Sequence, residues 1–245
     1  MRLTVVGCAP AYTWRSGRAS SCYLVEAGDT AIVLDMGQGA FSELWRYRSP
    51  GTLAAVFVSH LHADHCVDLI ALRHWVRYEN GGRGPALFGP TELRARFDAF
   101  QGQPDFLADM AVGSLGPGPL TVGSLVVETR RVTHIQDSFA FRVSLAGSDG
   151  PALVYSGDCA RADDLLPLLK PADTLLCEAA LGAGPDGGIH LTSAQAAGLA
   201  QRGGAARLIL THVLDRNAGP DLVPAGAGYD GEVLVAEPGM RVSLD

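Results

Sequence analysis

The chain has 245 residues, 47% of them hydrophobic, which is enough to bury a proper core and excludes pervasive disorder. Its formal net charge of -7 argues against a sequence-independent nucleic-acid binder, which would need clustered Lys and Arg. The five cysteines form no Cys-x-x-Cys pair, and no apolar run is long enough to span a bilayer. We therefore expect a protein without a disulfide framework or a membrane segment, working in the reducing cytoplasm.

Short strands dominate the first part of the chain. A β-branched run at residues 2–8 predicts the first strand. The apolar runs 22–27 and 30–35 flank Gly28-Asp29, which indicates a hairpin. The pattern then predicts, in chain order, a helix at 41–48, a buried strand at 56–59, a helix at 67–79, a strand at 86–88 and a helix at 91–101.

Strands and helices alternate in the second part. Residues 101–119 are rich in Gly, Pro and Asp, and we interpret them as a mobile surface segment, either a lid or a plain connector. The later elements are strands at 125–132, 138–145, 153–155, 174–177 and 207–210, and helices at 162–169 and 192–201. Because no linker or repeat interrupts the pattern, we expect one layered domain over residues 1–245, with helices packed outside two sheets.

One motif stands out, His60-Leu61-His62-Ala63-Asp64-His65, which places three imidazoles and a carboxylate within six residues. It falls between a predicted strand and a predicted helix. Imidazole and carboxylate are the usual ligands of zinc and similar divalent ions. A polar loop that is rich in His by chance is the alternative, but such spacing at a strand end is rare by chance. The sequence therefore predicts a metal site here.

Further polar residues follow other predicted strands. His134, Asp158, Glu178 and His212 each lie at or just past the end of an apolar run, where sites in α/β sheets usually form. Among the histidines, His74 lies outside this pattern, and we interpret it as a helix-surface residue. The candidate ligands are His60, His62, Asp64, His65, His134, Asp158 and His212. Seven ligands are too many for one tetrahedral zinc but suit two ions that share a carboxylate.

With these residues the sequence resembles the metallo-β-lactamase superfamily, whose signature HLHADH matches. The resemblance covers nearly the whole chain and implies an α+β fold, an αββα sandwich of two mixed sheets with helices on both outer faces. By position it implies that His60, His62 and His134 hold a first metal. It assigns Asp64, His65 and His212 to a second metal, with Asp158 as the bridge.

A finer resemblance points to the ribonuclease Z-like phosphodiesterases, and within them to small bacterial enzymes that act on cyclic nucleotides. It is carried by the segment 59–79, by Cys177-Glu178-Ala179 and by His190-Leu191-Thr192-Ser193. It implies catalytic roles for Asp64, Glu178 and His190, with Glu178 and His190 assisting proton transfer. Ribonuclease Z grips tRNA with an arm inserted before the bridging Asp. Here only 24 residues separate His134 from Asp158, so no tRNA-binding arm is evident.

The function hypothesis is therefore a dinuclear metal hydrolase that cleaves small, cyclic nucleotide-like phosphodiesters by attack of a metal-bound hydroxide. Zinc is the default metal, and manganese or iron also fits a mixed His/Asp site. The resemblance also makes a homodimer an expectation. The alternatives are a ribonuclease Z-like RNA endonuclease, a glyoxalase II-like thioester or lactone hydrolase, and a scaffold without activity. β-Lactam hydrolysis is less favoured because of the bridging Asp158.

Overall fold

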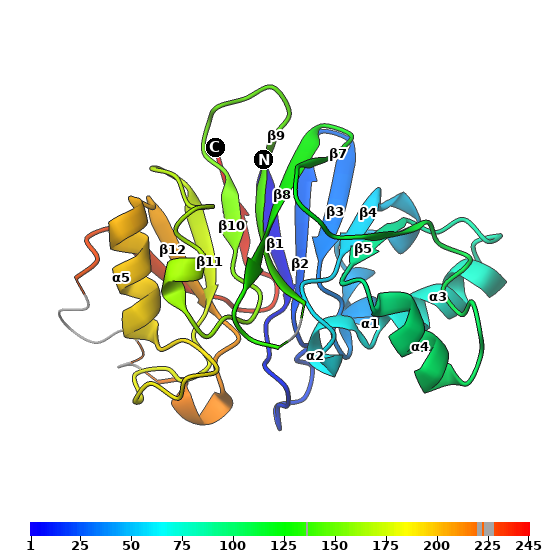
Figure 1. The fold of residues 1–245 in the computed structure, drawn as a ribbon, viewed down its shortest axis with the longest axis horizontal. Helices are drawn as coiled ribbons and strands as arrows, with labels where there is room; N and C mark the ends of the chain where they lie inside the picture. The colour runs from blue at the N-terminus through cyan, green and yellow to red at the C-terminus, as the bar shows by residue number, and fades with distance from the viewer. Residues whose placement is uncertain (136, 220–221, 223–227) are drawn as a thin grey trace.

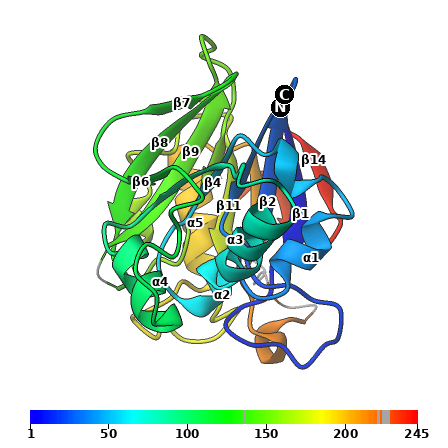
Figure 2. The same ribbon diagram turned by 90° about the vertical axis from the view of Figure 1, so that its right-hand side faces the viewer.

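The structure is a computed structural model that describes residues 1–135, 137–219, 222 and 228–245. Two seven-stranded sheets pack face to face, and helices cover the outer face of each, as Figures 1 and 2 show. This arrangement is the αββα sandwich with two mixed sheets, so the predicted fold is confirmed.

The two sheets have matching layouts. The first sheet contains, in spatial order, β14 (Arg241–Ser243), β1 (Arg2–Gly7), β2 (Cys22–Ala27), β3 (Thr30–Leu34), β4 (Ala55–Phe57), β5 (Ala86–Gly89) and β6 (Val112–Ser114). The second contains β13 (Glu232–Val235), β12 (Arg207–Thr211), β11 (Thr174–Glu178), β10 (Leu153–Tyr155), β9 (Ser138–Leu145), β8 (Leu125–Val132) and β7 (Leu120–Val122). In each sheet, antiparallel pairings on one side give way to parallel pairings from β3 to β6 and from β10 to β13.

The helices divide between the two outer faces. On the first sheet lie α1 (Ala40–Leu44), α2 (Ala63–Cys66), α3 (Leu69–Tyr78) and α4 (Leu93–Gln101), and on the second lies α5 (Ser193–Gly203). Short 3-10 turns are η1 (Pro50–Thr52), η2 (Ala162–Asp164) and η3 (Asp215–Asn217). No helix among the described residues is both long and apolar enough to cross a bilayer.

Three apolar layers hold this sandwich together. One fills the space between the sheets, and one lies under the helices on each outer face. A central strand therefore buries both of its faces, as β4 and β11 do along their whole length. This explains why β4 and the interior of β11, residues 175–177, are continuous apolar runs rather than alternating patterns.

Helix ends follow local sequence signals. Thr192 and Gln195 form a capping box at the start of α5, and Gly204 ends the helix in the left-handed conformation with φ 67°. This accounts for the close agreement between α5 and the helix predicted at 192–201.

Several parts of the chain differ from the prediction, which did not include the strands β7, β13 and β14. The helix expected at 162–169 is only the 3-10 turn η2, because Pro167 lacks a backbone donor and restricts the residue before it. The segment 101–119, expected to be a mobile surface segment, contributes the strand β6 and buries four apolar side chains. These are Phe106, Leu107, Met110 and Leu115.

Candidate metal centre

The candidate ligands meet because parallel strands of both sheets end at the same edge of the sandwich. His60 follows β4 in the first sheet, while Asp158 and His212 follow β10 and β12 in the second. His134 follows the end of β8, also in the second sheet. Asp64 and His65 lie in the short helix α2, which follows His60 and His62 in the chain. The seven ligands predicted from the sequence are thus brought together from distant parts of the chain.

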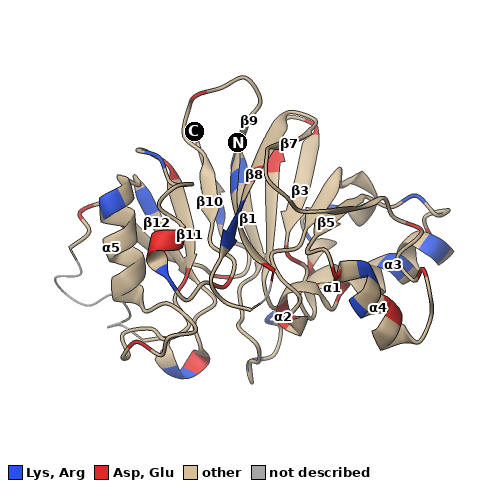
Figure 3. Ribbon diagram, in the orientation of Figure 1, with Lys and Arg blue, Asp and Glu red and all other residues tan. Residues whose placement is uncertain are grey.

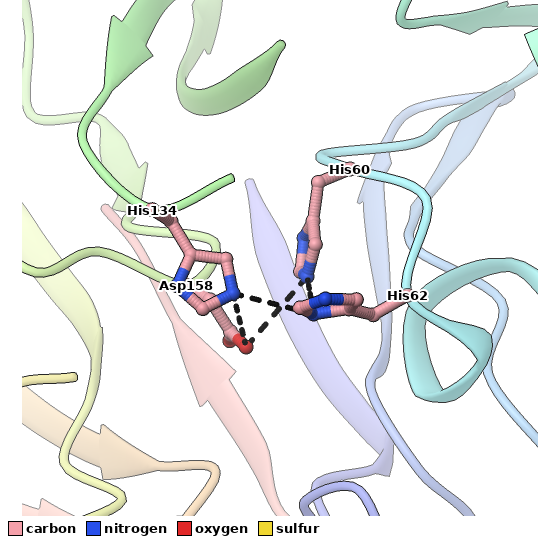
Figure 4. Close-up of side chains that lie close together, drawn as sticks. All are labelled: His60, His62, His134 and Asp158. Atoms are coloured by element: carbon pink, nitrogen blue, oxygen red, sulfur yellow. Dashed lines mark hydrogen bonds and ion pairs between the residues drawn. The ribbon is translucent and has the colours of Figure 1, made fainter. Parts of the chain in front are cut away.

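The first cluster consists of His60, His62, His134 and Asp158, drawn in Figure 4. His62 Nδ1 lies 3.0 Å from His60 Nε2 and 3.2 Å from His134 Nε2. Asp158 Oδ2 lies 3.7 Å from the Nε2 atom of both His60 and His134. Nitrogen ligands about 2.05 Å from one tetrahedral zinc would lie about 3.3 Å apart. The three imidazoles are therefore spaced as ligands of a single ion.

The second cluster consists of Asp64, His65, Asp158 and His212, all buried. His65 Nε2 lies 3.5 Å from Asp64 Oδ2 and 3.3 Å from Asp158 Oδ1. His212 Nε2 lies 3.7 Å from Asp64 Oδ2 and 3.4 Å from Asp158 Oδ2. Asp158 belongs to both clusters, which is the geometry expected of a bridging carboxylate.

Two buried polar atoms show that this centre fits a cation. Among the described residues, His65 Nε2 and Asp158 Oδ1 are buried without a hydrogen-bond partner. An unsatisfied buried polar atom is costly, and it calls for an explanation such as an ion. Because both atoms are candidate ligands of the second cluster, a divalent cation there would satisfy both.

Burial also sets the protonation of several ligands. It lowers the pKa of His60, of His134 and of His212, the last to about 4, so these rings stay neutral near pH 7. Neutral imidazole is the metal-binding form. Burial disfavours the charged form of Asp158 too, but the surrounding histidines outweigh it and lower the pKa of this carboxyl.

His65 behaves differently from the other ligand histidines. Burial disfavours its protonated form, but the carboxylates of Asp158 and Asp35 outweigh that effect and raise its pKa. Its Nδ1 lies 2.7 Å from Asp35 Oδ2, so Asp35 can hold a proton on Nδ1 and leave Nε2 to face the second cluster. Metal binding at His65 should therefore release a proton from Nε2.

In four of the candidate ligand histidines, the Nδ1 atom contacts a neighbouring residue outside the two clusters. Besides the His65–Asp35 contact, His134 Nδ1 lies 3.0 Å from the carbonyl of Ile189. The ring of His60 contacts Ser59 Oγ at 3.1 Å, and that of His212 contacts Ser21 Oγ at 3.3 Å. Such outer contacts fix the ring and its tautomer.

Asp35 is the most connected of these supporting residues, and the sequence reasoning missed it. Its fully buried carboxylate accepts hydrogen bonds from the backbone and hydroxyl of Ser59 at 2.6 and 2.8 Å and from Tyr155 at 2.7 Å. Its backbone has a φ of 60°, unusual for a residue other than glycine. A signal was present, since Asp35 also ends an apolar strand run, as Asp158 does.

Glu178 and His190 lie beside the shared carboxylate, as the resemblance implies. Glu178 Oε1 accepts from His190 Nδ1 at 2.9 Å, and the same ring nitrogen lies 3.9 Å from Asp158 Oδ2. Burial opposes protonation of His190, but the hydrogen bond and the charge of Glu178 outweigh it and raise the pKa of His190. His74, as expected, lies apart from the centre, with its Nδ1 2.8 Å from the carbonyl of Ile70.

The family-model comparison agrees with this geometry. The model of the beta-lactamase superfamily domain matches residues 30–213, a span that includes every candidate ligand. The chain belongs to the beta-lactamase superfamily. Its His/Asp clusters are compatible with a divalent metal site of that superfamily.

Three relatives illustrate this superfamily membership. An uncharacterized protein of Mycobacterium leprae is 36% identical, covering 95% of this chain and 85% of its own length. The probable metallo-hydrolase YhfI of Bacillus subtilis is 29% identical over 98% of both chains. Its crystal structure, described as a metallo-beta-lactamase fold protein, superposes with a TM-score of 0.85. The rat zinc phosphodiesterase ELAC protein 2 is 29% identical over 88% of this chain but only 30% of its own.

Proposed function

We propose that this protein is a metal-dependent phosphodiesterase that uses two divalent ions, zinc by default, to hydrolyse small phosphodiesters. The observation that carries the proposal is the Glu178–His190 pair, which lies directly beside the carboxylate shared by the two clusters. A hydrolase of this kind needs a proton donor for the leaving oxygen, and a buried Glu that contacts a His provides one. The name of the rat zinc phosphodiesterase supports the same reaction class.

The two ions, when bound, would neutralise charge on the phosphate oxygens and lower the pKa of a water molecule. The first cluster would take one ion on His60, His62 and His134, and the second would take the other on Asp64, His65 and His212. Asp158 would fix the separation of the two ions. The residues of the chain therefore position the phosphate at the edge where both sheets end.

His190 would act on the leaving group. Its Nδ1 hydrogen-bonds to Glu178 Oε1, so its Nε2 is the atom that can carry a proton to the leaving oxygen. The raised pKa of His190 keeps a larger share of the ring protonated near neutral pH. The Glu178 carboxylate is itself held by the backbone amides of Cys159 at 2.9 Å and Ala180 at 3.2 Å, so the pair has a fixed orientation.

A small substrate is favoured over tRNA. Between His134 and Asp158, the described residues 137–158 contain β9, a turn and β10, without a projecting arm. Figure 3 shows Lys and Arg scattered over both halves of the sandwich and interspersed with Asp and Glu. Strong binding of a long RNA backbone would call for a concentrated basic surface. These observations support a cyclic nucleotide-like phosphodiester rather than an RNA substrate.

A thioester or lactone hydrolase is the second candidate, because the same set of ligands can polarise an acyl carbonyl. A thioester hydrolase would leave the Glu178–His190 pair without an evident task, since a thiolate leaving group needs little protonation. A lactone releases an alkoxide, which would use the pair, so a hydrolysis panel has to separate lactone from phosphodiester hydrolysis. The pair therefore favours the phosphodiesterase over the thioester hydrolase.

A hydrolysis panel tests the proposal. The zinc-loaded protein should cleave bis-p-nitrophenyl phosphate and at least one cyclic nucleotide, and it should act poorly on an acylglutathione, a lactone and a precursor tRNA. A manganese-loaded sample, run in parallel, tests the choice of metal. Preferential hydrolysis of the thioester or lactone would overturn the phosphodiesterase proposal, and efficient cleavage of precursor tRNA would overturn the small-substrate proposal.

A further inference from the structure

An apolar pocket adjoins the metal centre on the side of His62. It has a volume of about 280 Å³, close to the lower end of the range typical of small-molecule sites. Its walls come from the segment 61–67, from α3 and from α4, which lie near one another in Figures 1 and 2. The lining residues are Leu61, His62, Ala63, Cys66, Val67, Ile70, Arg96, Phe97 and Phe100.

This pocket continues toward the metal ligands. Leu61, His62 and Arg96 also line an adjoining depression, which reaches Ile135, the residue after His134. His62 therefore contacts the first cluster on one side and the pocket on the other. The shared lining residues therefore place the pocket next to the first cluster, within reach of a group attached to a phosphate bound there.

Two side chains of α4 lack the partners that a purely structural role would give them. Phe100 is 70% exposed, although an aromatic ring gains from being covered. The Arg96 guanidinium makes no hydrogen bond or ion pair with any residue that the structure describes. By contrast, Arg94 of the same helix donates to the carbonyl of Val112 at 3.2 Å. An apolar ring beside a free planar cation matches an aromatic heterocycle that carries hydrogen-bond acceptors.

The pocket lies on the side of the centre away from the proposed proton donor. His134 stands between the two, with its ring centroid 5.0 Å from that of His62 and 5.0 Å from that of His190. Because His190 would face the leaving oxygen, the pocket is placed for the organic group that stays esterified to phosphorus.

From this geometry we infer that the pocket binds the nucleobase of the retained nucleoside, stacked against Phe100 and hydrogen-bonded by Arg96. The inference rests on the proposed phosphodiesterase function and specifies its substrate class. The pocket makes the enzyme selective for nucleotide-like diesters over diesters with a small alkyl group.

Two p-nitrophenyl diesters with the same leaving group test this selectivity. One is the p-nitrophenyl ester of thymidine monophosphate and the other is methyl p-nitrophenyl phosphate. Wild-type kcat/KM should favour the nucleoside ester by at least about tenfold, the scale expected of one stacked base. Arg96→Ala and Phe100→Ala should each remove most of that preference, mainly through KM. Arg94→Ala, a matched change on the same helix, should keep it.

The outcomes separate this inference from the proposed function. Equal wild-type rates on the two esters, or a preference that both variants retain, would overturn the nucleobase site while leaving the phosphodiesterase in place. A wild-type kcat/KM that is higher for hexyl p-nitrophenyl phosphate than for the thymidine ester would overturn the nucleobase site and indicate that the pocket binds alkyl chains. If the wild type cleaves neither ester, the proposed phosphodiesterase function is wrong. Calorimetry of the metal-loaded protein then tests on its own whether the pocket binds a nucleobase. AMP must then bind more tightly than methyl phosphate, and Arg96→Ala must reduce that difference.

Discussion

The two metal clusters differ in their access to solvent. The first contains the exposed His62, although the side chain of His134 is only 4% exposed, and a pocket adjoins it. Every ligand of the second is buried, and its His65 is fixed by the buried Asp35. One centre can thus combine an accessible candidate ion site with an enclosed one, in which a buried carboxylate holds a ligand histidine. We call the first cluster the open cluster and the second the buried cluster. We expect an ion to exchange faster from the open cluster than from the buried cluster.

The largest effect is expected where the two clusters meet. Asp158→Ala should lower phosphodiester hydrolysis by more than about four orders of magnitude, because both ions contribute several kcal/mol to catalysis and both lose their shared ligand. Steady-state kinetics together with metal analysis measures this. Asp163→Ala, which removes a carboxylate exposed at the surface, is the control. A variant that kept two ions and lost less than about tenfold in rate would show that Asp158 is not the bridge.

The second prediction concerns His190, whose ring lies near ligands of both clusters. His190→Ala should slow hydrolysis of a diester with a poor alkoxide leaving group by about 100- to 10,000-fold, the usual contribution of a general acid. A p-nitrophenolate leaving group, which needs no proton, should lose much less. His74→Gln serves as a control away from the centre. Equal losses on the two substrates would remove His190 from the acid role.

The third prediction tests Asp35, the buried carboxylate that holds His65 of the buried cluster. Asp35→Asn should weaken ion binding there by about 10- to 100-fold, as loss of a contact to a ligand histidine does, and leave the open cluster less affected. Ser21→Ala should have a smaller effect, because it removes only the 3.3 Å contact to His212. Competition with a chelator resolves the two ions. Preferential loss from the open cluster in Asp35→Asn would reverse our assignment of the two sites.

The smallest effect concerns pH. The Glu178 carboxylate raises the pKa of His190, so the protonated acid persists to higher pH, and the rate should fall as pH rises through that pKa. In Glu178→Gln the negative charge beside His190 is gone, and burial then lowers the pKa of His190. The rate should therefore begin to fall at a lower pH than in the wild type. Each unit of displacement costs about tenfold in rate on the alkaline side. An unchanged kcat profile for a poor leaving group would exclude this coupling.

The sequence predicted the sandwich and the clustering of the seven candidate ligands because the information was local. Apolar runs marked the buried strands, and polar residues at their ends marked the edge where His60, Asp158 and His212 meet. The capping box at Thr192 placed α5 in the same way. Parallel strands that end at one edge then bring distant residues together without further assumptions.

The parts that sequence reasoning missed depend on long-range contacts. Asp35 gains its role only because Ser59, His65 and Tyr155 converge on it in three dimensions. The pocket between α3 and α4 depends on how those helices pack on the first sheet. Strand β6 was missed because the Gly- and Pro-rich composition of residues 101–119 suggested a loop, while its pairing with β5 decides its structure.

Metal content per chain tests the central claim most directly. Mass spectrometry of the zinc-loaded wild type should find two ions per chain, and His62→Ala should keep one, because only the open cluster loses a ligand. Fewer than one ion per chain in a protein that still hydrolyses phosphodiesters would contradict a catalytic centre of two ions.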